Sequence, residues 1–169
     1  MERVKLTVLL AAILGSGALF GFYFTMSVSI MPGLDMTEPY AAITANQDIG
    51  RATQQSWFFV ALLGTPIALI AGIATHWKTP TARNWLALSL LGWVAMMGVT
   101  LALNVPLNQV LDGLHITPEQ ENLADLWAAY AVDWQKWNWL RVLTSGVSLI
   151  ALEMAFRTAQ SFTKAAIAP

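Results

Sequence analysis

Four long apolar stretches alternate with more polar connections along the chain. The apolar stretches cover residues 4–30, 57–74, 85–103 and 140–156. Stretches of about 20 mainly apolar residues suit helices that cross a hydrocarbon layer of about 30 Å. The pattern therefore predicts an all-α fold, an integral membrane four-helix bundle formed by a single domain over residues 1–169. The first apolar run continues to Ile30, so we interpret it as a span and not as a cleaved signal.

The first long connection, residues 31–56, predicts a turn followed by a helix. Met31-Pro32-Gly33 predicts a sharp exit from the first span. Pro39 suits the first position of a helix, and the pattern after it runs without a break into the second span. Helix 2 should therefore extend beyond the membrane, with Gln47 and Gln54 on one face.

The second long connection, residues 104–139, predicts a similar extension of helix 4. Thr117, Pro118 and Gln120 have the spacing of a helix start, and no Pro or Gly follows until Gly146. The fourth helix is thus expected to begin well before its span. Both extensions should lie on the extracytoplasmic side.

The distribution of basic residues predicts the orientation of the bundle. Cytoplasmic loops of membrane proteins carry an excess of Lys and Arg. We therefore place both termini in the cytoplasm of a multi-pass protein of the bacterial inner membrane. The basic residues on the side of the termini are Arg3, Lys5, Lys78, Arg83, Arg157 and Lys164, whereas Arg51, Lys136 and Arg141 lie on the other.

Composition excludes several classes of function. The chain is 56% hydrophobic and 11% charged, unlike an ordinary soluble domain, and membrane lipid is an expected partner. Its net charge of −1 and the lack of a basic cluster give no reason to expect a nucleic-acid partner. The chain has no cysteine, which excludes disulfides, thiolate nucleophiles and iron–sulfur clusters. His76 and His115 fall on opposite sides of the membrane, so we expect no haem or metal site and no cofactor.

Small residues recur at helical spacing in the first two spans. They form the patterns Gly17-xxx-Gly21 and Gly64-xxx-Ala68-xxx-Gly72. Small residues allow helix backbones to approach closely, so these faces are predicted to pack within the bundle.

A stripe of aromatic and polar residues marks the fourth helix. Trp127, Tyr130, Trp134, Asn138 and Arg141 follow one another at offsets of three and four, so they project from one face. A simple packing seam would be aliphatic. An arginine at membrane depth suggests a functional site, although a polar knot that ties helices together explains it equally well.

A second polar motif, Asn104-Val105-Pro106-Leu107-Asn108, stands at the end of the third span. Its two amides share a helical face, and Pro106 frees a carbonyl group in the preceding turn. By the predicted topology, Asn138 and Arg141 lie at the same depth. We expect these groups to meet at the outer edge of the membrane.

These two motifs together resemble the anthrone oxygenase-like family of small four-helix membrane proteins. The resemblance implies oxidation of a flat phenolic substrate by dioxygen, without metal or flavin. The candidate catalytic residues are Arg141, Asn138, Asn104 and Asn108, and the candidate substrate-binding residues are Trp127, Tyr130, Trp134, Trp137 and Gln54.

The implied chemistry assigns roles to these side chains. An anthrone reacts with dioxygen after its methylene group loses a proton, which requires a base, a cation for the oxyanion and a flat apolar slot. Arg141 suits the oxyanion, the asparagines suit the phenolic oxygens, and the aromatic rings suit the slot. The base is open: Asp133 lies off the stripe by about 100°, and Tyr130 has a high unperturbed pKa.

A non-catalytic function is the competing interpretation. A short chain rich in tryptophan also suits an accessory or assembly subunit of a larger membrane complex, or a protein that holds a bound lipid. A transporter or channel is disfavoured, because the spans carry few ionisable groups and no inverted repeat.

Overall fold

The chain folds as α-helices joined by short connections. The computed structural model describes residues 2–167, with side chains through residue 161, and no strand occurs in that part of the chain. Two of the helical stretches contain a π-helical turn, labelled η. The elements are α1 (Glu2–Thr25), η1 (Met26–Ile30), α2 (Met31–Asp35), α3 (Pro39–Gln54), α4 (Phe58–Thr75), α5 (Pro80–Val99), η2 (Thr100–Asn104), α6 (Val105–Asp112) and α7 (Leu123–Ile167).

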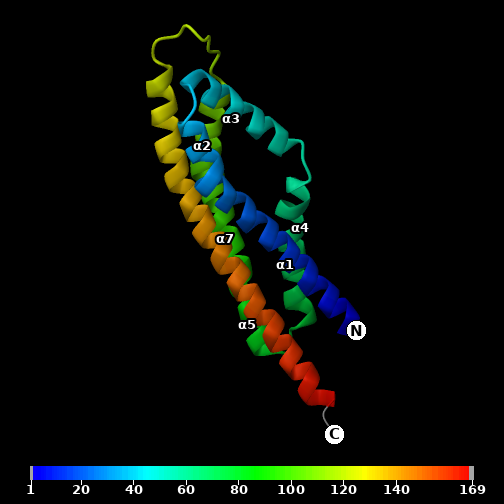
Figure 1. Ribbon diagram of the computed structural model, residues 1–169. Helices are drawn as coiled ribbons and strands as arrows, with labels where there is room; N and C mark the ends of the chain where they lie inside the picture. Colours follow the sequence, from blue (N-terminus) through cyan, green and yellow to red (C-terminus); the bar gives the residue numbers. More distant parts are fainter. Residues whose placement is uncertain (1, 168–169) are drawn as a thin grey trace.

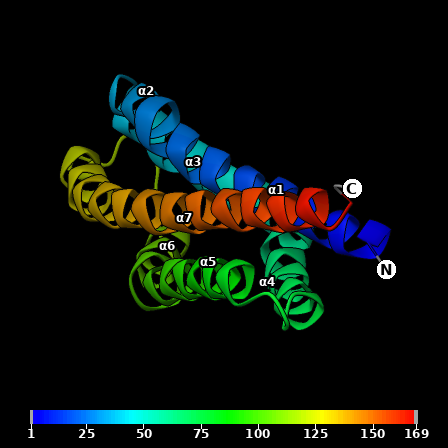
Figure 2. The same cartoon turned by 90° about the horizontal axis from the view of Figure 1, so that it is seen from below.

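Four helical segments are long and apolar enough to cross a membrane, which confirms the predicted helical membrane bundle. They are Glu2–Asp35, Phe58–Thr75, Pro80–Asp112 and Leu123–Ser161. α7 runs the length of the molecule, and its last turns lie at the same end as the first turn of α1 (Figure 1). Seen from below, α7 crosses the middle of the view, with α1 and α2 on one side of it and α5 and α6 on the other (Figure 2). α1 also packs directly against α4. The most extensive helix contact joins α7 to α5.

The predicted exit at Met31-Pro32 is wrong, because the first helix continues through Pro32 to Asp35. A proline inside an α-helix removes one hydrogen bond and clashes with the carbonyl group four residues earlier. Here η1 widens the helix just before Pro32, and the Met31 N–H donates to the Met26 carbonyl group, five residues back. The same arrangement precedes Pro106, where the Val105 N–H donates to the Thr100 carbonyl group. A π-helical turn thus carries each helix past its proline.

The predicted unbroken helix from Pro39 into the second span is also wrong, because α3 and α4 are separate. The break falls at residues 55–57. There the Ser56 hydroxyl group donates to the Thr53 carbonyl group at 2.9 Å and accepts from the Phe58 N–H at 3.1 Å. Serine side chains that bond to the local backbone compete with helix continuation. In consequence α3 runs obliquely from the end of α2 to the start of α4 (Figure 1).

The fourth helix begins at Leu123, five residues later than the predicted first helical position, Pro118. The segment at Pro118 forms a turn instead, in which the Gln120 N–H donates to the Thr117 carbonyl group at 3.2 Å. The Gln120 side chain donates to Asn122 Oδ1 at 2.7 Å, so it does not complete a capping box. The long stripe on this helix is unaffected, since it begins at Trp127.

The predicted small-residue faces pack only in part. A Cβ atom added at Gly17, Gly21 or Gly64 would meet nothing within 4 Å, whereas one at Gly72 would touch Leu86. The closest backbone approach lies elsewhere, at Gly92 of α5. A Cβ atom there would lie 2.9 Å from the Thr144 carbonyl oxygen and 3.1 Å from the Ser148 Cα atom. The absence of a side chain at Gly92 therefore lets α5 and α7 pack backbone to backbone.

We expect Gly92→Ala to lower the free energy of unfolding by about 1–3 kcal/mol, because the added methyl group overlaps backbone atoms that cannot rotate away. Thermal unfolding in detergent, followed by circular dichroism, measures the effect. Gly98→Ala is the matched control in the same helix, since a Cβ atom there meets nothing within 4 Å. Equal melting temperatures for the two variants would contradict the close approach of α5 and α7.

Candidate functional site

The five stripe residues of α7 are all buried. They are Trp127, Tyr130, Trp134, Asn138 and Arg141. Each faces the interior of the bundle because residues three and four apart share one side of a helix. Arg141 lies 14 residues after Trp127, so the stripe extends about 21 Å along the helix axis.

A hydrogen-bond network around Asn108 holds the upper part of the stripe. Asn108 Oδ1 accepts from the Tyr130 hydroxyl group at 3.0 Å and from Trp134 Nε1 at 2.8 Å. The Tyr130 oxygen in turn accepts from Asn46 Nδ2 of α3 at 2.8 Å. Further up, Trp127 Nε1 donates to Asp35 Oδ1 at 2.8 Å. The aromatic residues are therefore fixed by α2, α3 and α6, and not by apolar contact alone.

The middle of the stripe is tied to the π-helical turn η1. Asn138 Nδ2 donates to the Tyr23 carbonyl group at 2.8 Å and to Ser27 Oγ at 2.6 Å. Gln135 Nε2 donates to the Ser27 carbonyl group at 2.7 Å. That carbonyl group needs a side-chain donor, because the Met31 N–H is used by Met26 and Pro32 has no N–H. Pro32 and η1 thus create the acceptor that binds α7.

Asn104 joins the same layer from the opposite side. It lies at the end of η2 with no exposed surface, and its Nδ2 donates to the Trp134 carbonyl group at 3.2 Å. The structure therefore brings three of the candidate residues, Asn104, Asn138 and Trp134, into one polar layer of the bundle. Asn108 lies one turn above it.

Arg141 is buried between two aromatic rings. Its Cζ atom lies 4.6 Å from the centre of the Tyr23 ring and 4.9 Å from that of the Trp134 ring, within range for cation–π attraction. No carboxylate among the described residues forms an ion pair with it. Its Nε and Nη2 atoms are buried without a hydrogen-bond partner in the described part of the chain. A buried cation in this state is costly unless an anion or a strong acceptor binds it.

Three buried acceptor oxygens, on η2 and α7, are unpartnered as well. Asn104 Oδ1, Asn138 Oδ1 and Gln135 Oε1 have no hydrogen-bond donor among the residues that the structure describes. Unsatisfied donors and acceptors thus occur together in one buried layer. Such groups are rare in folded proteins and call for a specific explanation, such as a bound molecule.

The remaining candidate residues lie outside this layer. Trp137 is half-buried and stacks with Lys136, whose Nζ atom lies 4.4 Å from the ring centre. Gln54 is exposed at the end of α3, and no hydrogen bond joins it to the stripe. Asp133 is exposed on another face of α7, so the structure does not place it beside Arg141.

The comparisons with known proteins identify the family. The sequence profile of the anthrone oxygenase family matches residues 51–151, more than half of the chain. The chain belongs to this family. No curated protein and no solved structure matches it. The family match includes Asn104, Asn108, Asn138 and Arg141, whereas α1 and most of α3 lie outside it.

This member of the anthrone oxygenase family places further residues at the site that the sequence patterns did not indicate. They are Tyr23, Ser27, Asp35, Asn46 and Gln135. Tyr23 and Ser27 lie within an apolar span, where an isolated tyrosine or serine is unremarkable. Asn46 directly precedes Gln47, which the sequence placed on a polar face of this helix. The structure buries both side chains.

Histidines and carboxylates do not gather around this site. The His76 ring is buried near the termini and bonds to the Gly72 carbonyl group, while His115 is exposed. Within the described residues, no three His, Asp or Glu side chains are grouped as a metal site would require. The side chains around Arg141 are amides, phenols and indoles, and the Asp35 carboxylate lies further along the stripe, at Trp127.

Proposed function

We propose that the protein is a membrane-embedded, cofactor-independent oxygenase that oxidises a flat phenolic substrate of the anthrone type. Membership of the anthrone oxygenase family supports this class of reaction. The observation that carries the proposal is the buried Arg141 guanidinium group, which has two nitrogen atoms without partners. An enolate or phenolate oxygen is the acceptor that such a group lacks.

The proposed reaction replaces a substrate methylene group by a carbonyl group. Transfer of one methylene proton to a base gives an enolate, whose carbon then bonds to dioxygen, and return of that proton to the outer oxygen gives a hydroperoxide. Loss of the second hydrogen from that carbon with cleavage of the O–O bond releases water and leaves the quinone. One oxygen atom enters the product and the other leaves as water, so the four electrons lost by carbon reduce one dioxygen molecule.

Arg141 has the largest role in this reaction. It stabilises the negative charge that develops on the substrate oxygen as the proton leaves, and the charge is strongly felt because the site excludes water. The side-chain oxygens of Asn104 and Asn138 accept hydrogen bonds from the substrate's phenolic groups. The rings of Tyr130 and Trp134 lie along the stripe and provide a flat surface for the substrate.

The orientation of the protein follows from its charges. We propose that both termini face the cytoplasm of a bacterial cell, since most Lys and Arg residues lie near the termini and in the α4–α5 connection. Arg141 then lies near the outer surface of the membrane. A lipid-soluble substrate can reach this depth from the bilayer.

The test is turnover by the purified full-length protein. In mild detergent, with a dihydroxyanthrone and isotopically labelled dioxygen, we expect quinone formation faster than with heat-denatured protein and one labelled oxygen atom in each product. A rate equal to that of the denatured control would overturn the proposal. If the inactive protein also migrates at fixed stoichiometry with other membrane proteins, the result supports an accessory subunit.

A further inference from the structure

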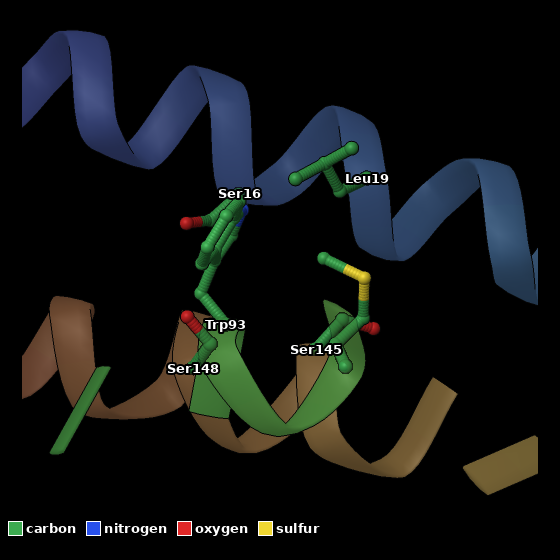
Figure 3. A pocket seen from close by; sticks show the side chains of 6 residues that line it. Ser16, Leu19, Trp93, Ser145 and Ser148 are labelled. Carbon is green, nitrogen blue, oxygen red and sulfur yellow. The ribbon is translucent and has the colours of Figure 1, made fainter. Parts of the chain in front are cut away.

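The aromatic part of the stripe is covered in this structure. The side chains of Trp127, Tyr130 and Trp134 are only 7%, 6% and 5% exposed. A small hollow between α1, α5 and α7 does not lead to them, because it presents only apolar surface and none of the stripe residues lines it (Figure 3). A flat substrate therefore reaches these rings when a covering element moves.

Among the elements that cover the stripe, α3 is the one that is not continuous with a candidate membrane span. α2 and α6 are the last turns of the spanning segments Glu2–Asp35 and Pro80–Asp112. α3 is separated from α2 by the non-helical residues 36–38, and from α4 by the non-helical residues 55–57. Short links of this kind absorb the backbone rotations of a hinge, so α3 can move as a unit.

The face that α3 turns towards the stripe is small and partly polar. Of its four buried side chains, Ala42 and Ile43 belong to the same apolar cluster as the stripe aromatics. The other two are neighbouring amides. Asn46 Nδ2 donates to the Tyr130 hydroxyl oxygen at 2.8 Å, and Gln47 Nε2 donates to the Leu111 carbonyl group at the end of α6, also at 2.8 Å. Elements with few buried apolar contacts open locally more readily than the core.

The Asn46 contact links the position of α3 to the guanidinium group. The Tyr130 hydroxyl group accepts from Asn46 and donates to Asn108 Oδ1, which also accepts from Trp134 Nε1. The Trp134 ring in turn lies against Arg141. Closure of α3 therefore completes the hydrogen-bond chain that holds this ring beside Arg141.

We propose that α3 is a lid over the stripe. It opens about residues 36–38 and 55–57 to admit the substrate, and it closes when Asn46 binds Tyr130 and Gln47 binds the end of α6. The inference rests on the proposed function, because admission of the substrate is the reason for the movement. It adds to that function a route to the rings and two residues that control it.

Cysteine labelling tests the movement without depending on turnover. The chain has no cysteine, so Ile43→Cys places a single thiol on the inner face of α3, where Ile43 has no exposed surface. With a water-soluble maleimide and the full-length protein in mild detergent, this thiol should react at least about tenfold faster than that of Leu152→Cys. Leu152 is equally buried in α7, in a different apolar cluster, and reports opening of the whole bundle. Equal rates would mean that α3 opens only with the whole bundle, and the proposal would fail.

The amide of Gln47 has a matched control in the same helix. Added to Ile43→Cys, Gln47→Ala removes the hydrogen bond to the end of α6 and should speed labelling about two- to tenfold, as the loss of one hydrogen bond predicts. Gln54 is exposed at the end of α3, so Gln54→Ala should leave the rate unchanged. The same rate in both variants would contradict the role of Gln47 in closing the lid.

The final measurement uses a dihydroxyanthrone without dioxygen, so that it binds but is not oxidised. At about ten times its Kd it should slow the labelling of Ile43→Cys about tenfold, because it binds under the closed lid. An unchanged or faster rate would overturn the proposal. Protection of the thiol without quinone formation in air would support the lid and contradict the oxygenase, whereas quinone formation without protection would do the reverse.

Discussion

Replacing Arg141 with methionine should reduce anthrone turnover by about a hundredfold or more, as expected when the main charge partner of a developing oxyanion is lost. Methionine keeps much of the side-chain length but carries no charge and no donor. The effect should appear in kcat as well as kcat/KM, because the enolate is more negative than the bound substrate. Quinone formation measured against substrate concentration separates the two constants.

The matched control is Arg157→Met in the same helix. Arg157 is exposed and pairs with Glu153 at 2.8 Å, so its loss should leave turnover unchanged. The melting temperature distinguishes the functional role of Arg141 from a structural one. Without a bound anion, burial of this cation opposes folding, so Arg141→Met should be at least as stable as the unmodified protein. A clear loss of stability together with normal turnover would identify Arg141 as part of a structural polar knot.

The periodic features of the sequence predicted the architecture well. The apolar stretches were long enough to identify all four candidate spans. The spacing of Trp127, Trp134 and Arg141 also predicted a single buried face, because a helix 45 residues long keeps its phase over these positions. These features depend only on helix geometry.

The errors fall where tertiary contacts decide the local structure. Pro32 was interpreted as a helix end. The helix continues because η1 redirects the Met31 N–H to the Met26 carbonyl group, and the Gln135 side chain donates a hydrogen bond to the Ser27 carbonyl group. Ser56 gave no visible signal of the break between α3 and α4, because its effect depends on two hydrogen bonds of its side chain. Local propensity cannot reveal such compensation.

The candidate site was predictable only on the helices that carry its motifs. Asn104, Asn138 and Arg141 were visible because amides and a guanidinium group are unusual at membrane depth. Tyr23 was not, because its role depends on how α1 packs against α7 and not on its neighbours in the sequence. The contact between Asn46 and Tyr130 joins residues 84 positions apart, and no sequence pattern specifies it.

Asn108→Leu should lower the free energy of unfolding by about 2–4 kcal/mol, because Asn108 accepts two hydrogen bonds from aromatic residues of α7. Leucine has a similar volume but no acceptor, so the Trp134 N–H and the Tyr130 hydroxyl proton would lose their partner. Thermal unfolding measures the loss, and the near-ultraviolet circular dichroism of the tryptophans should change with it.

The neighbouring residue provides the control for this substitution. Gln109 is exposed in the same helix, so Gln109→Leu makes a comparable amide-to-leucine change without removing an acceptor of the network. We expect its melting temperature to stay within about 2 °C of the unmodified protein, as is usual for surface substitutions. If both variants unfold at the same temperature, the hydrogen bonds of Asn108 do not stabilise the stripe, and apolar packing alone must hold Trp134 beside Arg141. Because the Trp134 ring lies against the guanidinium group, the loss of the Asn108 acceptor should also lower turnover, whereas Gln109→Leu should not.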